Sequence, residues 1–210
     1  MKTRGLYQKR LKKAKRIAYL LSYIPFVRMV ALSGSMTSKD IKANSDIDFF
    51  LVAQTGHIWT ARFLTVLLLK ILGQYRSDEK TAGKICPNRF QTEDLLTIYP
   101  HNYYHAKEYS QIIPLFENED IVQKYIKANQ WILGYDLKFK MDNSKIKRYF
   151  LTEMFRKFGE RILSGRFGNI MEMKLKDYQK NRILWDKRTY QNKARIIISD
   201  RVLCFHPKAR

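Results

Sequence analysis

Four residues in the first quarter of the chain have the types and the spacing that suit phosphate and metal chemistry. Gly34 and Ser35 follow a short apolar run, and after ten intervening residues come Asp46 and Asp48. Side chains two apart on a strand point to the same face, so the two carboxylates are expected to lie side by side. Such a pair repels itself in a low-dielectric site, and a divalent cation removes that repulsion.

The expected cation is Mg²⁺ or Mn²⁺, because these ions take carboxylate oxygens and complete their coordination with water and substrate phosphates. Gly34 has no Cβ, so its backbone can approach phosphate oxygens closely. The Ser35 hydroxyl and the neighbouring backbone N–H groups can then donate hydrogen bonds to those oxygens. Together these residues predict a site for a nucleoside triphosphate (NTP) with its metal ion.

This segment resembles the DNA polymerase β-like nucleotidyltransferase superfamily, in the form of a bacterial nucleotidyltransferase domain protein. The signature of that superfamily is an apolar strand that ends in Gly-Ser, a short spacer, and then Asp, apolar, Asp, apolar. The resemblance covers about residues 26–95. The matching residues are Leu32, Gly34, Ser35, Asp46, Ile47, Asp48 and Phe49.

The resemblance implies a Mg²⁺-dependent enzyme. Asp46 and Asp48 would bind the catalytic metals, and Gly34 and Ser35 would bind the triphosphate. The reaction would move a nucleoside monophosphate (NMP) from an NTP to an acceptor hydroxyl and release pyrophosphate, with the metals stabilising the attacking and leaving oxygens.

One part of the superfamily pattern is missing. A later strand normally supplies a third carboxylate, often the general base, yet the expected strand over 84–90 contains no Asp or Glu. Asn88 occupies a plausible facing position but cannot take a proton, while Glu93 and Asp94 would serve only if the strand runs longer. The gap leaves a second hypothesis open, a catalytically impaired nucleotidyltransferase fold that binds nucleic acid.

The charge of the chain is concentrated at its two ends. The 210 residues carry a formal charge of +21, and residues 1–30 hold nine Lys and Arg with no acid. Residues 138–197 are also strongly basic, whereas 31–137 are nearly neutral. Basic ends favour RNA or another polyanion as the binding partner. An anionic membrane surface is the partner that we rank last. The candidate nucleic-acid-binding residues are Lys9, Lys12, Lys13, Arg16, Lys174, Lys176 and Lys180.

The pattern of elements predicts an α/β (α+β) fold, with a small mixed nucleotidyltransferase sheet, flanking helices and a C-terminal helical lobe. We expect a basic N-terminal helix in 1–23, a nucleotidyltransferase-like domain in 24–100 and a basic helical lobe and tail in 101–210. A proline at position 87 suits an edge strand or a bulge. The expected strands are 26–32, 46–53 and 84–90, the expected helices 3–22, 58–72, 105–115, 120–130, 145–163 and 171–188, with a turn at 164–169 and two apolar clusters at 196–198 and 202–205.

The most apolar segment, 58–73, is interrupted by Arg62 and Lys70 and is short for a membrane span, so we expect a helix buried against the sheet. No secretory signal is evident, and no integral membrane segment is predicted. Cys86 and Cys204 lie far apart without a CxxC pair, which predicts neither a disulfide framework nor a zinc site. A cytoplasmic location is expected.

Overall fold

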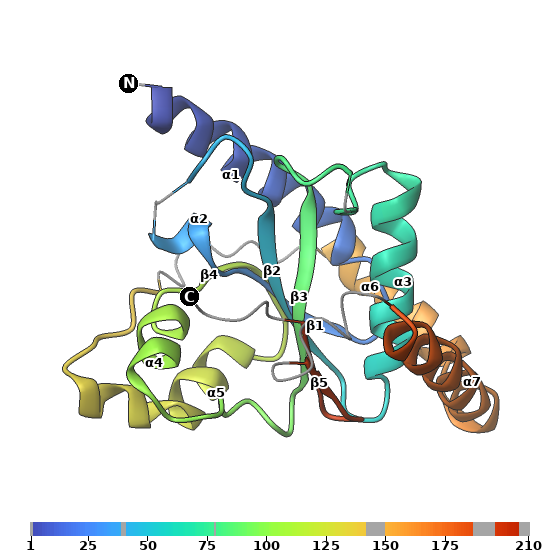
Figure 1. The fold of residues 1–210 in the computed structure, drawn as a ribbon. Helices are drawn as coiled ribbons and strands as arrows, with labels where there is room; N and C mark the ends of the chain where they lie inside the picture. The colour runs from blue at the N-terminus through green and yellow to red at the C-terminus, as the bar shows by residue number, and fades with distance from the viewer. Residues whose placement is uncertain (1, 39–40, 78, 142–149, 187–195, 206–210) are drawn as a thin grey trace.

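The computed structural model describes residues 2–38, 41–77, 79–141, 150–186 and 196–205. Within these residues six strands form one mixed sheet with helices on both faces, which confirms the predicted α+β fold class (Figure 1). In sheet order the strands are β4 (Ile113–Glu117), β1 (Val27–Leu32), β2 (Ile47–Ala53), β3 (Ile85–Thr92), β6 (Val202–Phe205) and β5 (Ile196–Ile198).

The strand directions determine which residues meet at each edge of the sheet. β2 and β3 are parallel, so the residues that begin these two strands lie together. β1 is antiparallel to β2, with Leu32 opposite Phe49, and therefore its end reaches the same edge. The segment that follows β1 arrives beside the start of β2.

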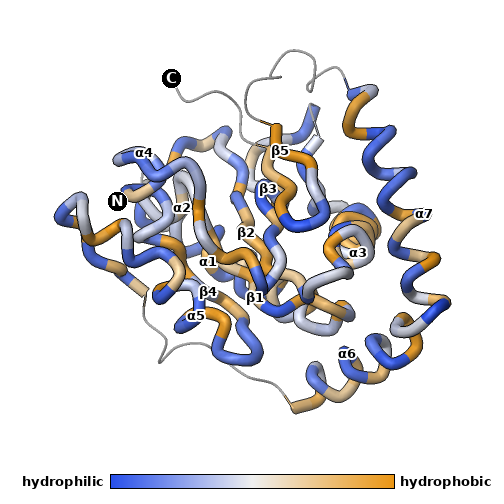
Figure 2. The backbone as a smooth tube through the Cα atoms, turned by 90° about the horizontal axis from the view of Figure 1, so that it is seen from below, coloured by the Kyte–Doolittle hydropathy of each residue, from blue (hydrophilic) through white to orange (hydrophobic). Residues whose placement is uncertain are grey.

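The helices divide between the two faces of the sheet. One hydrophobic cluster joins the sheet to α1, α3 and α7, and a second cluster joins the opposite face to α4, α5 and η1. α6 and α7 run along the outer side of the molecule, with α7 beside α3 (Figure 2). The helices are α1 (Lys2–Leu21), α2 (Ser35–Ser38), α3 (Ile58–Ile71), α4 (Tyr103–Tyr109), α5 (Ile121–Ala128), the 3₁₀ helix η1 (Gln130–Tyr135), α6 (Phe150–Ile162) and α7 (Gly165–Leu184).

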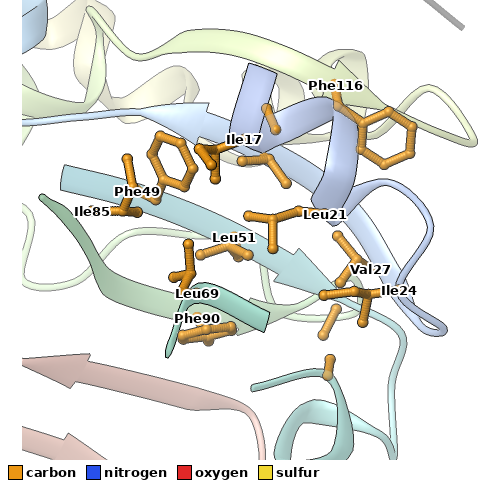
Figure 3. Close-up of a cluster of buried hydrophobic side chains, with 14 of the residues drawn as sticks. Ile17, Leu21, Ile24, Val27, Phe49, Leu51, Leu69, Ile85, Phe90 and Phe116 are labelled. Atoms are coloured by element: carbon orange, nitrogen blue, oxygen red, sulfur yellow. The ribbon is translucent and has the colours of Figure 1, made fainter. Parts of the chain in front are cut away.

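The central strand β2 contributes to both clusters. Phe49 and Leu51 point into the first cluster, which also contains Leu21 of α1 and Leu69 of α3 (Figure 3). Phe50 points into the second cluster, where its ring meets those of Tyr109 and Tyr125. Because Asp48 lies two residues before Phe50, it shares the second face.

Most of the expected elements are confirmed. The helix over 3–22 and the strands over 26–32 and 46–53 are present as α1, β1 and β2, within a residue or two of the expected ends. The two apolar clusters near the end of the sequence are β5 and β6, and β6 attaches this segment to β3. Residues 145–149 and 187–188 of two expected helices lie outside the described residues.

The third strand is longer and more central than expected. It continues to Thr92 and lies between β2 and β6 rather than at an edge. The expected bulge at Pro87 is confirmed, since Phe49 pairs with Pro87 and Phe50 with Arg89, which leaves Asn88 as an extra residue. A bulge of this kind re-aims side chains beside it.

Two expectations between 105 and 169 are wrong. The helix predicted over 105–115 ends at Tyr109, and Ile113–Glu117 instead forms the edge strand β4. Pro114 would interrupt a helix, whereas an edge strand tolerates it, and β1 offers backbone partners there. The turn predicted over 164–169 is shorter, because α7 begins at Gly165.

The long apolar helix α3 lies between the sheet and α7 and is only partly buried, which is less than expected. Trp59, Ala61 and Leu69 are buried, while Leu67 and Ile71 are exposed. No helix in the described part of the chain is both long enough and apolar enough to pass through a bilayer. The division of the chain at residue 100 stays a prediction, and the sheet takes strands from both sides of it.

The polar side of α6 is held by a cluster of hydrogen bonds around Glu160. Its carboxylate Oε1 accepts from Arg28 Nη1 at 2.6 Å, from the Phe26 backbone N–H at 2.9 Å and from Arg156 Nη1 at 3.1 Å. Burial alone would raise the pKa of Glu160, but the hydrogen bond and charge of Arg28 prevail and the pKa is lowered. The apolar side chains of α6, such as Phe158, consequently face outward.

Replacing Glu160 should destabilise the fold in a pH-dependent way. Glu160→Gln removes the charge, and we expect the free energy of unfolding at pH 7 to fall by about 2 kcal/mol. A lowered folded-state pKa means that this stabilisation is present above the unfolded pKa of about 4.3 and is lost as the pH falls through the folded value. Urea unfolding of both proteins at pH 7 and at acidic pH measures the difference.

The matched control is Glu153→Gln, which removes a partly exposed carboxylate of α6 that pairs with the exposed Lys157 at 2.7 Å. Exposed pairs contribute little, so the control should change stability by less than about 1 kcal/mol. A loss in Glu160→Gln that is the same at every pH would contradict the assigned role.

Candidate active site

The turn after β1 lies directly against Asp48. Gly34 has φ +62°, and a Cβ at this position would lie 2.4 Å from Asp48 Oδ2. The Ser33 backbone N–H donates to Asp48 O at 3.1 Å, and the Thr37 backbone N–H and hydroxyl both donate to Gly34 O. Only glycine satisfies both the backbone conformation and the close approach. Ser35 follows it as the first residue of α2, half-buried.

The two predicted carboxylates lie together at the start of β2. Asp46 Oδ2 lies 3.2 Å from Arg76 Nη1, and Asp48 Oδ1 accepts a hydrogen bond from Asn88 Nδ2 at 3.4 Å. One ligand atom each from Asp46, Asp48 and Cys86 all lie within 4.8 Å of one another. Gly34, Asp46, Asp48 and Asn88 therefore lie together, with a thiol in addition, and Ser35 is the next residue after Gly34.

The electrostatics of this group disfavour two bare carboxylates. The pKa of Asp48 is raised to about 8, first by burial and then by the charges of Asp46 and Glu108, while Arg76 acts in the opposite direction. A raised carboxyl pKa means that this environment destabilises the ionised form of Asp48. A bound cation would stabilise that form.

Cys86 stands on the strand where the superfamily pattern has a third carboxylate. It pairs directly with Asp48 across the parallel strands, and its Sγ lies 3.7 Å from Arg76 Nη1. Burial, followed by the charges of Asp48 and Asp46, raises the pKa of the thiol to about 12. The sequence carries one weak signal for Cys86, because its two-residue spacing from Asn88 repeats that of Asp46 and Asp48.

The alternative third ligands Glu93 and Asp94 lie at the opposite edge of the sheet from Asp48. They follow the far end of β3, where the Glu93 backbone N–H donates to Ala53 O. Ala53 lies five positions after Asp48 on an extended strand, a distance of about 17 Å. Glu93 there lies 3.6 Å from the guanidinium of Arg28, and Asp94 forms a 2.7 Å ion pair with Arg201.

A carboxylate that sequence reasoning missed approaches from α4. Burial raises the pKa of Glu108 to about 7, although the charge of Arg89 and a hydrogen bond with Tyr104 oppose the shift. Its charge is among those that raise the pKa of Asp48. Glu108 comes from a helix sixty residues beyond Asp48, so strand spacing carries no signal for it.

The donor set fits a divalent cation. Two carboxylate oxygens and one sulfur converge from two adjacent strands, and a guanidinium already contacts two of the three residues. Arg76 thus supplies a positive charge where a metal ion would, and a metal bound by all three residues would displace it. Its side chain is 36% exposed, which leaves it room to move.

The basic candidates are split between two helices. On α1, Lys9, Lys12 and Arg16 are exposed, while Lys13 is half-buried and donates to Gly83 O at 3.0 Å. α1 packs against β1 and β4, whereas α7 packs along α3. On α7, Lys174 and Lys180 are exposed and Lys176 pairs with Asp200 at 2.6 Å. The structure therefore does not bring the two sets together.

Comparison with known proteins gives little further information. No family model matches the chain, and no curated protein matches it. A solved structure of a toxin–antitoxin with AMP-PNP is similar over 74% of this chain and 98% of its own, at 15% sequence identity and a TM-score of 0.32. At this TM-score the similarity assigns neither a family nor a function.

The contact between Gly34 and Asp48 predicts a selective effect of Gly34→Ala. A Cβ at this position must displace the Asp48 carboxylate, so Mn²⁺ affinity should fall at least about tenfold. Gly73→Ala is the control, because Gly73 has φ +61° and a Cβ there would meet no described atom within 4 Å. Both variants should lose about 1–2 kcal/mol of stability through the left-handed backbone. Equal Mn²⁺ affinity in the two variants, measured by calorimetry, would contradict the contact's role.

The charges around Asp48 predict opposite pKa shifts in two variants. Asp46→Asn removes a neighbouring negative charge and should lower the pKa of Asp48 from about 8, while Arg76→Ala should raise it. Carboxyl ¹³C titration by NMR measures both. Arg201→Ala, which removes an arginine at the far end of β3, should leave the pKa unchanged. Shifts of the same sign in the first two variants would refute this account.

Proposed function

We propose that this chain is a divalent-metal-dependent nucleotidyltransferase, which moves an NMP from an NTP to an acceptor hydroxyl. The observation that carries the proposal is the packing of the Gly34 turn on Asp48, beside Asp46. This close approach of the turn to paired carboxylates supports a site in which the turn binds the triphosphate and the carboxylates bind its metal ion.

Each residue has a distinct role in this proposal. Asp46 and Asp48 hold Mg²⁺ or Mn²⁺, and Gly34 and Ser35 donate hydrogen bonds to phosphate oxygens. A bound cation would neutralise charge on the triphosphate during the displacement. Without it, Arg76 balances part of the carboxylate charge, as its 3.2 Å contact with Asp46 indicates.

The candidate base is Glu108. Transfer to a hydroxyl requires a group that accepts its proton, and a base is most effective when its pKa is near the working pH. Glu108 is proposed for this role because its charge acts on Asp48 and burial raises its pKa to about 7, whereas the Asn88 amide cannot accept a proton. The base would then come from α4 rather than from the third strand.

The acceptor is proposed to be RNA or another polyanion. The exposed Lys9, Lys12 and Arg16 of α1 supply positive charge, and α1 is joined to the loop before Asp46 by Arg10, which donates to Lys42 O and Ala43 O. Binding through these residues should weaken as salt rises, because neutralised phosphates release counterions.

One observation favours a second candidate function, a nucleotidyltransferase fold that binds nucleic acid without catalysis. The two β3 side chains beside Asp48 are a thiol and an amide, Cys86 and Asn88. If Glu108 does not act as the base, the site can bind nucleotide and metal without promoting transfer.

A transfer assay separates the two candidates. The protein is incubated with α-labelled NTPs, Mg²⁺ or Mn²⁺ and a mixture of RNA and protein acceptors. We expect label to appear on a macromolecule, and Asp48→Asn to reduce the rate on the order of a hundredfold or more because charge stabilisation is lost. Glu108→Gln should slow transfer while NTP binding persists.

The controls distinguish failure of chemistry from failure of the site. Glu93→Gln changes a carboxylate at the far end of β3 and should transfer label normally. NTP and RNA binding without transfer under any condition would favour the second candidate. An NTP affinity that neither Asp46→Asn nor Asp48→Asn alters would refute the transferase, and RNA binding that is also absent would refute the second candidate.

A further inference from the structure

The metal site contains a ligand that changes which ion it selects. We infer that Cys86 is a direct ligand of the divalent cation, so that the site prefers Mn²⁺ and thiophilic ions such as Co²⁺ and Cd²⁺ to Mg²⁺. This inference rests on the proposed function for the metal-binding role of Asp46 and Asp48, and it adds the identity of the ion.

The geometry of the strands places the sulfur beside both carboxylates. Cys86 is the direct partner of Asp48 in the parallel pairing of β2 and β3, and its ligand atom lies within 4.8 Å of those of both aspartates. Three donors at this mutual separation can bind one ion. The thiol is the only one of the three donors that is not an oxygen.

A cationic group already contacts this cluster. Arg76 Nη1 lies 3.2 Å from Asp46 Oδ2 and 3.7 Å from Cys86 Sγ, so one positive group touches a carboxylate and the sulfur together. The backbone N–H of Arg76 donates to Ile85 O at 3.0 Å, which fixes the start of the side chain beside Cys86. The position between Asp46 and Cys86 therefore accepts positive charge.

The chemistry of the donors decides the preference among ions. Mg²⁺ is a hard ion that requires near-ideal octahedral oxygen coordination, whereas thiolate ligands favour softer metals. On binding, the thiol proton is released to solvent and the sulfur lone pair binds the metal, with no change of oxidation state. A carboxylate at position 86 would favour Mg²⁺, and the thiol does not.

The simpler role for Cys86 is that of a small buried side chain, and Cys204 provides the comparison. Cys204 lies on β6, where its sulfur is 3.8 Å from Arg89 Nη1, and among the described residues it belongs to no cluster of metal-ligating groups. A residue that only fills space should tolerate serine without any change in metal preference. If Cys86 is a ligand, its replacement by serine should change the metal preference.

The test uses Co²⁺ as a spectroscopic probe of the 210-residue chain, with Mg²⁺, Mn²⁺ and Cd²⁺ as competitors. A cobalt–thiolate bond gives a charge-transfer absorption in the near ultraviolet that oxygen ligands do not give. We expect this band in the wild type and in Cys204→Ser, and its absence in Cys86→Ser. The ratio of Cd²⁺ to Mg²⁺ affinity should fall at least about tenfold in Cys86→Ser.

A second variant keeps the inference falsifiable if serine weakens all binding. Cys86→Asp restores a third carboxylate and should raise Mg²⁺ affinity while it removes the cobalt band. Circular dichroism checks that each variant is folded. A band that persists in Cys86→Ser, or an unchanged affinity ratio in both variants, would overturn the inference.

The aspartate variants separate this inference from the proposed function. If Asp48→Asn loses Co²⁺ binding while Cys86→Ser keeps both the band and the ratio, the metal site stands and only the thiol ligand is wrong. If neither Asp46→Asn nor Asp48→Asn alters Co²⁺ binding, the metal assignment itself fails, and the inference fails with it.

Discussion

The parallel pairing of β2 and β3 is the constraint on which the rest of the site depends. Parallel strands bring their first residues to one edge, so Asp48 and Cys86 become direct neighbours although 38 residues separate them in sequence. The same direction carries Glu93 away to the opposite edge. A sheet with β3 reversed would bring a carboxylate to Asp48 and remove the thiol.

A second constraint comes from the antiparallel strand β1. Its end meets the beginning of β2, and the turn that follows lies so close to Asp48 that no side chain fits at position 34. The carboxylate is held from one side by this turn and from the other by Asn88 at the β3 bulge. The position of Asp48 therefore depends on two irregular segments supported by regular strands.

Much of this arrangement can be predicted from the sequence because it is local. The spacing of Asp46 and Asp48, the glycine in the turn and the apolar runs of β1 and β2 all act within about 30 residues, where strand periodicity is reliable. The helix predicted over 105–115 is wrong for two reasons: Pro114 is a local signal against a helix, and the open edge of β1 offers residues 113–117 a strand partner that no local pattern contains.

The contributions of Cys86, Arg76 and Glu108 could not be predicted in the same way. The position of Cys86 depends on the register of β3, that of Arg76 on the packing of the segment after α3, and that of Glu108 on the packing of α4. All three are non-local properties. To predict the fold class, it is enough to know the order of the helices and strands. To predict which residues form the site, one must also know which residues pair across neighbouring strands.

The place of β6 in the sheet has a consequence for how the chain acquires its structure during synthesis. β3 pairs with β2 on one side and with β6 on the other, and Thr92 meets Arg201 across 109 residues of sequence. As the chain emerges from the ribosome, β3 has one unpaired edge until β6 has been made. An open strand edge can pair with other chains, so this interval is when the nascent protein is most exposed to misassembly.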